Sequence, residues 1–407
     1  MGNPKLRPIE AMPVRYHGRK MVQLFDPTGL SEHALAVPQE MLPVLALFDG
    51  THSITDIQAI LTRRFGRLVF SDEIRGMVEQ LDEALLLDSE RFAAHLDDLT
   101  QAYRAAPVRQ PASAGSGYPK DPNKLRAAID SFFTLPDGPG APEPGTADGR
   151  VVGLVAPHID FKRGAVGYAH AYKALVEGCD ADLFVVLGTA HHANDALYIL
   201  TDKGFETPLG MTRTNAGLVH ALAERCPGDP FAEELVHRGE HSIELQVVLL
   251  QHLFADRAIE LLPVLCGSME LAVGEGVPSQ TPAVAGFVAA LRETLAGSGR
   301  RACVIASADL AHVGRQFGHD FDLTPRLMSE VERADRAALE HVVALDADAF
   351  YEAIMLDGNA RHICGLGNIC TLLATVDAAR CELLDYRQAV AREEGCAVTF
   401  ASMALYA

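Results

Sequence analysis

The sequence has no tryptophan, few aromatic residues and no excess of basic residues. Aromatic residues make up 6% of the 407 residues, and 35 lysines and arginines face 54 acidic residues, for a formal net charge of -19. A chain with this charge repels the phosphate backbone, so we expect no nucleic acid partner. No apolar run approaches the roughly 18 residues that cross a bilayer, so we also expect no membrane segment.

The cysteines lack the spacing of metal ribbons and redox motifs. All eight lie beyond residue 178, none forms a C-x-x-C pair, and no signal peptide precedes them. This pattern indicates reduced thiols, and we expect a cytoplasmic protein.

The chain divides at a segment rich in proline, glycine, alanine and serine. We interpret residues 106–149 as a linker and lead-in segment, with one helix around LRAAIDSFF. A single core rarely grows beyond about 250 to 300 residues, so the length also favours two domains. We expect one domain over residues 1–105 and another over residues 150–407.

The first domain carries three amphipathic patterns, at residues 38–50, 53–66 and 71–87, which predict three helices. LLLDSERF at 85–92 would follow as a hairpin. Three helices and a hairpin indicate a small, α-rich winged-helix domain. The third helix has five carboxylates against one arginine in SDEIRGMVEQLDEAL, so we expect a peptide or protein partner.

The second domain alternates apolar runs with helical patterns. VVGLVAP, DLFVVLGTA and ACVIASA are typical of buried strands, and AVTFASMALYA predicts a closing strand. This alternation predicts an α/β fold with a mostly parallel central sheet flanked by helices.

Metal-capable side chains follow three of these predicted strands. His158, His191, Asp309 and His312 each come after an apolar run, and ligands in open α/β sheets bind at the carboxyl ends of the strands. Cys364 precedes the helical pattern GNICTLLATV, whose dipole would favour a thiolate. Two or more imidazoles with an anionic ligand suit iron, copper or zinc, so we predict a metal site.

Several roles in this crevice stay open. His191 and His192 are adjacent and diverge, so we favour His191 as the ligand and His192 as a contact to substrate or a carboxylate. Asp309 and His312 form a ligand pair, a carboxylate that orients an imidazole, or an acid/base pair. Each histidine alone also fits a hydrogen-bonded core residue, and Cys364 a small buried hydrophobe.

The segment GEHSIELQ places His241 and Glu244 three residues apart, on one face of a helix that begins there. A charged glutamate in so apolar a segment needs a partner. Two alternatives stay open: a capping cluster with Ser242 as the cap, or support for the metal ligands.

Seven ordered motifs resemble the Memo family, called AmmeMemoRadiSam system protein B in bacteria and archaea. The resemblance covers about residues 112–407 and rests on APHIDF, LGTAHH, FETPLG, EHSIELQ, LLPVLCG, SADLAHVG and ICGLGNICTLL. It implies a fold similar to the class III extradiol dioxygenases.

The resemblance also implies site residues. Memo-type ligands map onto His158, His191 and Cys364, and the pocket histidines and aspartate map onto His241, His312 and Asp309. A thiolate softens the site, which favours copper or thiolate-bound iron and makes zinc a weaker expectation.

The sequence departs from the family pattern in two motifs. AGSGYP at 114–119 stands where the family has AGSWYP, and PHIDF at 157–161 where it has PHAGY. The second change puts Asp160 next to the pocket. Residues 1–105 are absent from short family members and resemble PqqD-like winged-helix modules, which bind leader peptides.

These observations predict a metal-dependent oxidoreductase with a small-molecule or peptide substrate. We expect His312, Asp309 or His241 to move protons, and His192, Asp160 and Glu244 to contact substrate. The alternatives are a non-enzymatic scaffold or metal chaperone, and a metal-assisted hydrolase that uses zinc with Asp309.

Overall fold

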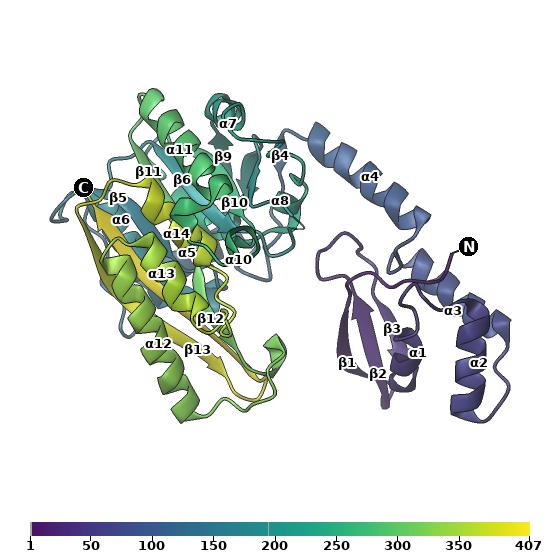
Figure 1. Ribbon diagram of the computed structural model, residues 1–407. Coiled ribbons are helices and arrows are strands. Elements are labelled where there is room, and N and C mark those ends of the chain that lie inside the picture. The colour runs from purple at the N-terminus through teal and green to yellow at the C-terminus, as the bar shows by residue number, and fades with distance from the viewer. Residues whose placement is uncertain (1, 194) are drawn as a thin grey trace. The chain divides into compact units, whose positions relative to one another are not determined.

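The computed structural model describes residues 2–193 and 195–407, which form two compact units divided between Ala105 and Ala106 (Figure 1). Across these described ranges, no helix combines the length and apolar character that a bilayer crossing demands. Each unit has its own hydrophobic core.

The smaller unit begins with an antiparallel sheet that the sequence patterns did not predict. Its strands are β1 (Glu10–Tyr16), β2 (Arg19–Phe25) and β3 (Leu35–Pro38), in the order β1-β2-β3. His17 and Gly18 join the first two strands, both with left-handed backbone, as a two-residue hairpin loop with inverted turn geometry requires. Val22 and Leu24 of β2 point into the core.

Helices follow this sheet. They are α1 (Leu42–Leu45), preceded by a 3-10 turn over Gln39–Met41, then α2 (Ile54–Phe65), α3 (Ser71–Glu83) and α4 (Glu90–Ala105). The predictions at 53–66 and 71–87 are confirmed by α2 and α3, and Ser53 and Asp56 cap α2 reciprocally. The expected hairpin over 85–92 is wrong, because Leu87 bridges Leu6 and α4 starts at Glu90.

The larger unit contains one mixed sheet that is mostly parallel at its centre, as predicted. The strand order is β12-β14-β5-β11-β6-β10-β9-β8-β4, with β13 beside β14 and β7 beside β10. The strands are β4 (Val108–Arg109), β5 (Val151–Ala156), β6 (Leu183–Thr189), β7 (Tyr198–Leu200), β8 (Gly204–Thr207), β9 (Gly210–Thr214), β10 (Glu260–Cys266), β11 (Ala302–Ser307), β12 (Asp309–Val313), β13 (Arg380–Ala391) and β14 (Cys396–Tyr406).

Helices cover both faces of this sheet (Figure 1). They are α5 (Pro122–Phe132), α6 (Phe161–Gly178), α7 (Ala216–Ala223), α8 (Val236–Gly239), α9 (Ser242–Leu253), α10 (Met269–Val273), α11 (Pro282–Gly297), α12 (Pro325–Val343), α13 (Ala347–Met355) and α14 (Leu366–Thr375). Three-residue 3-10 turns lie at Pro278–Gln280 and Arg315–Phe317. Strands β5 and β6 are buried along their whole length, which explains their unbroken apolar runs.

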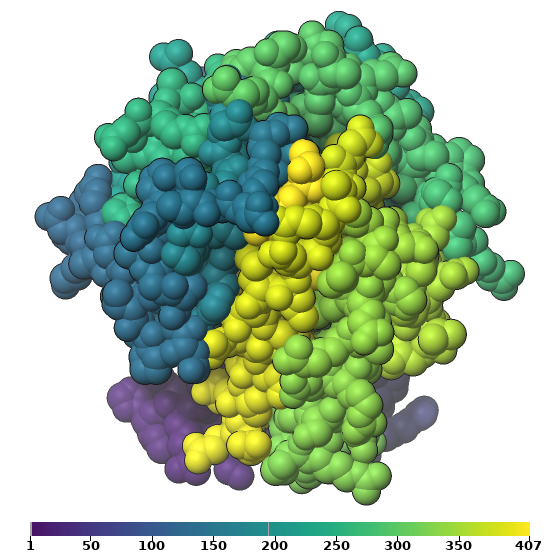
Figure 2. Space-filling view, turned by 90° about the vertical axis from the view of Figure 1, so that its left-hand side faces the viewer, coloured from purple at the N-terminus to yellow at the C-terminus, as the bar shows by residue number. Residues whose placement is uncertain are grey.

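Residues 106–149 belong to the larger unit. Val108–Arg109 pairs with β8, α5 packs in the same core as α6 and α9, and the rest of the segment to residue 149 has no regular element. The C-terminal hairpin β13–β14, yellow in Figure 2, crosses one face of this unit.

Parallel strand pairing brings the carboxyl ends of the predicted site strands to one edge of the sheet. Strand β11 pairs in parallel with β5, with Ser307 opposite Ala156, and in parallel with β6. The residues that follow these three strands, including His158 and His191, therefore lie at the same edge of the sheet.

Candidate metal centre

His158 is held in one tautomer at the end of β5. Its Nδ1 lies 2.9 Å from the carbonyl oxygen of Ser307, which can only accept, so Nδ1 carries a proton and Nε2 is the nitrogen left to bind a metal. The His158 amide donates to Asp309 Oδ1 at 2.9 Å, and the residue is 2% exposed. A buried imidazole with one nitrogen fixed by a carbonyl is the usual arrangement of a metal ligand.

Glu240 orients two more imidazoles. Its Oε2 lies 3.0 Å from His191 Nδ1, and its Oε1 lies 3.2 Å from His241 Nδ1. The same carboxylate accepts from the backbone amides of His191, His241 and Ser242 at 2.8–3.2 Å. Both imidazoles therefore use Nδ1 for Glu240 and leave Nε2 as the nitrogen that can bind a metal.

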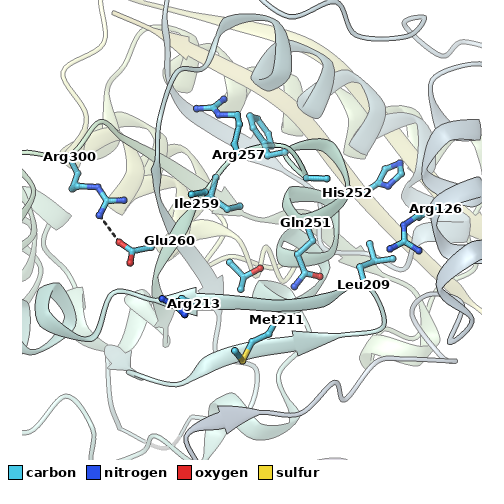
Figure 3. A pocket seen from close by; sticks show the side chains of 14 residues that line it. Arg126, Leu209, Met211, Arg213, Gln251, His252, Arg257, Ile259, Glu260 and Arg300 are labelled. Carbon is cyan, nitrogen blue, oxygen red and sulfur yellow. Dashed lines mark hydrogen bonds and ion pairs between the residues drawn. The ribbon is translucent and has the colours of Figure 1, made fainter.

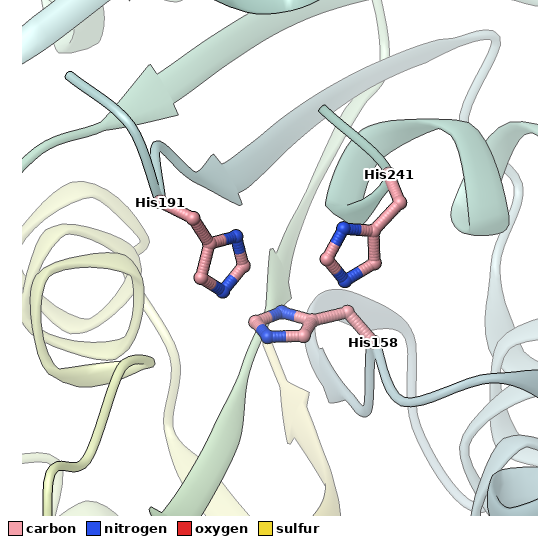
Figure 4. A group of neighbouring side chains, drawn as sticks. All are labelled: His158, His191 and His241. Carbon is pink, nitrogen blue, oxygen red and sulfur yellow. The ribbon is translucent and has the colours of Figure 1, made fainter. Parts of the chain in front are cut away.

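The three imidazoles converge. The potential ligand atoms of His158, His191 and His241 lie within 4.8 Å of one another (Figure 4). The rings of His191 and His241 are stacked with centroids 5.1 Å apart, and His158 meets both edge-on. Two nitrogen ligands of one tetrahedral ion lie about 3.4 Å apart, so small side-chain rotations bring these atoms onto one ion. The group can therefore hold a metal ion.

Cys364 lies beside the same imidazoles. Its Sγ is 3.2 Å from His158 Nε2, close to the separation of about 3.5 Å between a sulfur and a nitrogen ligand on one ion. Gly365 caps α14 directly after it. Burial raises the pKa of the thiol, but the charges of His158 and His312 and hydrogen bonds from His158 and His191 hold this pKa well below its usual range. The residue is suited to ligate as a thiolate.

The imidazoles differ in their charge. Burial lowers the pKa of His158, but Asp309 and Cys364 outweigh it and raise this pKa to about 9. Burial likewise opposes Glu240 at His191, where the carboxylate wins and raises the pKa. At His241 burial dominates and lowers the pKa to about 4. A dication would take the place of the two imidazolium protons, so the donor set fits a metal.

Asp309 and His312 flank this group on β12. Asp309 is buried, and its Oδ2 lies 3.7 Å from His158 Nε2. His312 is half-buried, its Nδ1 lies 3.1 Å from the carbonyl oxygen of Leu310, and its ring packs edge-on against Phe317. The structure therefore places Asp309 against a ligand candidate, and His312 close enough for its charge to act on Cys364.

Two predicted substrate contacts are near neighbours of the metal-ligand candidates in the sequence: His192 follows His191, and Asp160 follows His158 by two residues. His192 is exposed, next to His191. Asp160 caps α6, accepting from the Arg163 amide at 3.2 Å, and pairs with the Arg163 guanidinium at 2.5 Å. The carboxylate that departs from the family motif thus has a structural role at the start of a helix.

Glu244 lies outside the imidazole group. Its side chain is fully buried, pairs with Arg109, and accepts from the Tyr118 hydroxyl and from the amides of Ala112 and Ser113 at 2.9 Å. These donors anchor the lead-in segment to α9. Ser242, the cap in one of our alternatives, donates to the Thr189 carbonyl oxygen instead, while Glu240 accepts from the first amides of the helix.

The sequence analysis missed two residues that build the site. Glu240 immediately precedes His241, and this adjacency in the EHSIE motif was the available signal. Asn368, in α14, places its amide nitrogen 2.6 Å from the carbonyl oxygen of Ser307 and 3.1 Å from that of Leu187. It thereby ties the ends of β6 and β11 to the helix that follows Cys364.

Comparison with known proteins gives the family. The Memo-like protein family matches residues 109–404. A MEMO1 family protein of Aquifex aeolicus is 27% identical over 408 residues, covering 99% of this chain and 100% of that protein. Relatives from Methanopyrus kandleri (31% identity, 68% of this chain, 91% of the relative) and Thermus thermophilus (26%, 82% and 93%) carry the same family name. Because the match includes all three imidazoles and Cys364, and spans most of the larger unit, the chain belongs to the Memo family.

Proposed function

We propose that the protein is a metal-dependent oxidoreductase that binds one iron or copper ion through His158, His191 and Cys364. The observation that carries this proposal is the position of the Cys364 sulfur, 3.2 Å from a His158 nitrogen whose tautomer the Ser307 carbonyl fixes. A soft thiolate beside imidazoles favours copper or iron over the harder metal ions that prefer carboxylate ligands. Such an ion, when bound, supplies one-electron chemistry or activates oxygen.

The protein's own residues would orient the reactants and move protons. His241 is uncharged at neutral pH and turns Nε2 toward the other imidazoles. With a pKa of about 4 it is a weak base, so it is suited to accept a hydrogen bond from a small-molecule or peptide substrate, and a proton only from an acidic group. Glu240 holds this ring in place. His312 and Asp309 border the same group and are further candidates for acid and base, with His192 at the exposed side.

A second candidate is a zinc hydrolase. Three imidazoles with mutually close nitrogens form the ligand set of zinc sites that keep one position for water. Asp309 would then act as the base and Cys364 would be a neighbour.

Metal content of purified variants separates the two candidates. For the thiolate site we expect His158→Ala, His191→Ala and Cys364→Ser to lose bound iron or copper, and His241→Ala to keep it while losing turnover. For the zinc site His241→Ala loses metal and Cys364→Ser keeps it. His220→Ala, an exposed histidine paired with Asp202, is the control. Full occupancy in all four site variants would refute both.

We further propose that residues 1–105 form a PqqD-like domain that binds a peptide or protein. Asp72, Glu73 and Glu79 of α3 are exposed, and Leu68 and Phe70 beside them are 57% and 60% exposed. This surface suits a partner with basic and apolar side chains. Salt-sensitive binding of the full chain to a basic peptide, weakened in Glu73→Lys, would support it, and tight binding to duplex DNA would overturn it.

All eight cysteines are free thiols. This supports placing the protein in a reducing compartment such as the cytoplasm.

A further inference from the structure

A pocket lies at the edge of the sheet opposite to the candidate metal centre. A cavity of about 600 Å³ is lined by several cationic side chains and one carboxylate: Arg126, Arg213, Arg257, Arg300, His252 and Glu260 (Figure 3). This volume is in the range of sites for small organic ligands.

The pocket is separate from the imidazole group. Glu260 is the first residue of β10, and its backbone lies opposite that of Arg213 in the neighbouring strand β9. Both residues therefore lie near the amino end of β10, whose carboxyl end faces the metal site. His241 precedes α9, whereas His252 lies in its last turn. This 12-residue helix spans about 18 Å, which separates the two sites.

Part of the positive charge is already engaged. Arg300 pairs with Glu260 at 2.6 Å and with Asp182 at 3.0 Å. His252 pairs with Asp130 at 2.6 Å. Arg257 donates to the carbonyl oxygens of Cys179 and Ala181. These groups form part of the pocket wall. The one carboxylate of the lining, Glu260, is already paired with Arg300.

Two guanidinium groups stay uncompensated. Among the residues that the structure describes, no carboxylate lies within 4.0 Å of Arg126 or Arg213. The printed hydrogen bond of Arg126 goes to the Pro122 carbonyl oxygen of its own helix, at 3.5 Å. Figure 3 shows the two arginines on opposite sides of the pocket. The chain carries a net charge of -19, and these two exposed cations, from α5 and β9, line one cavity.

The space between the two arginines has an apolar lining. Leu209, Phe254 and Ile259 contribute to it. The amide of Gln251 lies between Leu209 and Ile259 (Figure 3). Guanidinium groups bind carboxylate and phosphate oxygens through paired hydrogen bonds, and an apolar lining accepts a carbon skeleton or a ring. We propose that this pocket binds a small organic polyanion, whose phosphate or carboxylate groups contact Arg126 and Arg213.

Calorimetric titration of the full chain at low ionic strength tests this site. AMP serves as the phosphate probe and citrate as the carboxylate probe. We expect saturable binding of at least one probe, and about tenfold weaker binding in Arg213→Gln and in Arg126→Gln, because each loses a charge-assisted contact. Binding of AMP alone assigns a phosphate ligand, and binding of citrate alone assigns a polycarboxylate.

Arg326→Gln is the matched control, because it removes the same charge from an exposed position on α12. Its affinity should stay within about twofold of the parent, the scatter of a surface change. Equal weakening in the control would show general charge attraction and overturn the site. No saturation by either probe up to about 10 mM would also overturn it, because a dissociation constant above about 10 mM is too weak for a specific site. Metal content is unaffected in either case, so this result stands apart from that of the metal site.

Discussion

Two buried glutamates four residues apart have opposite roles. Glu240 is 5% exposed and Glu244 is fully buried. Glu240 holds the imidazoles of His191 and His241 at the candidate metal centre. Glu244 holds Arg109 and the lead-in segment on the other side of the same helix start.

The difference lies in the partners and not in the burial. The donors around Glu244 belong to an arginine, a tyrosine and backbone amides, none of which is a metal ligand or a general base at this site. The side-chain donors around Glu240 are rings whose other nitrogens are free for chemistry. A buried carboxylate indicates function when its partners are themselves reactive groups. Arg109 also donates to the Glu240 carbonyl oxygen at 2.6 Å, so the two groups share one contact.

The largest expected effect is on folding, at Glu244. Glu244→Gln leaves the guanidinium of Arg109 buried without its counter-charge, which lowers the free energy of unfolding by about 3 to 5 kcal/mol. Urea unfolding of the full chain measures this loss, with Glu275→Gln as an exposed control. Metal content per folded molecule should stay at the parent value, and metal loss without loss of stability would reverse the comparison.

At Glu240 the main effect is expected on metal affinity. Glu240→Gln removes the charge that orients His191 and His241, and changes of this kind weaken metal binding by about 10- to 100-fold. Competition with a chelator of known affinity measures the change. A variant with parent-like affinity would make Glu240 a structural residue like Glu244.

Asp26, in the smaller unit, extends the comparison to a purely structural carboxylate. Burial raises its pKa, but hydrogen bonds from Thr28 and the Arg7 guanidinium outweigh burial and lower it. A lowered pKa stabilises the folded state above the unfolded value near 3.8, and this stability is lost as the pH falls through the lower folded value.

We therefore expect Asp26→Asn to lower the stability of the smaller unit by about 2 kcal/mol at pH 7. The difference from the parent should shrink as the pH falls below 3.8. Hydrogen exchange of residues 1–105 in the full chain at both pH values measures it. A difference that is the same at both would contradict the assignment.

The smallest effect is expected at Asp160. Asp160→Ala removes the cap of α6 and its pair with Arg163, at a cost of about 1 kcal/mol in thermal or urea unfolding. Asp160→Asn keeps a capping oxygen and should recover most of the loss. If substrate affinity falls in both variants while stability is kept, Asp160 contacts substrate as we first expected.

The sequence predicted the edge of the sheet that carries the site, because parallel strands with unbroken apolar runs leave little choice about where their carboxyl ends meet. His158 and His191 follow such runs. The small antiparallel sheet was missed because β1 is exposed along nearly its whole length and shows no alternation. The sequence does not distinguish the roles of Glu240 and Glu244. They differ because the lead-in segment, distant in the sequence, packs against Glu244 and donates hydrogen bonds to it.

One feature of the large sheet bears on how the protein is made. Strand β14 lies between β12 and β5, which carry Asp309 and the approach to His158, yet it follows every other strand of the sheet in the chain. During synthesis, β12 and β5 therefore lack the strand that joins them in the sheet until β14 is made. Such late, long-range pairing is slow and leaves strand edges open. We expect productive metal loading to follow completion of β14, and nascent chains that stall before it to depend on chaperones.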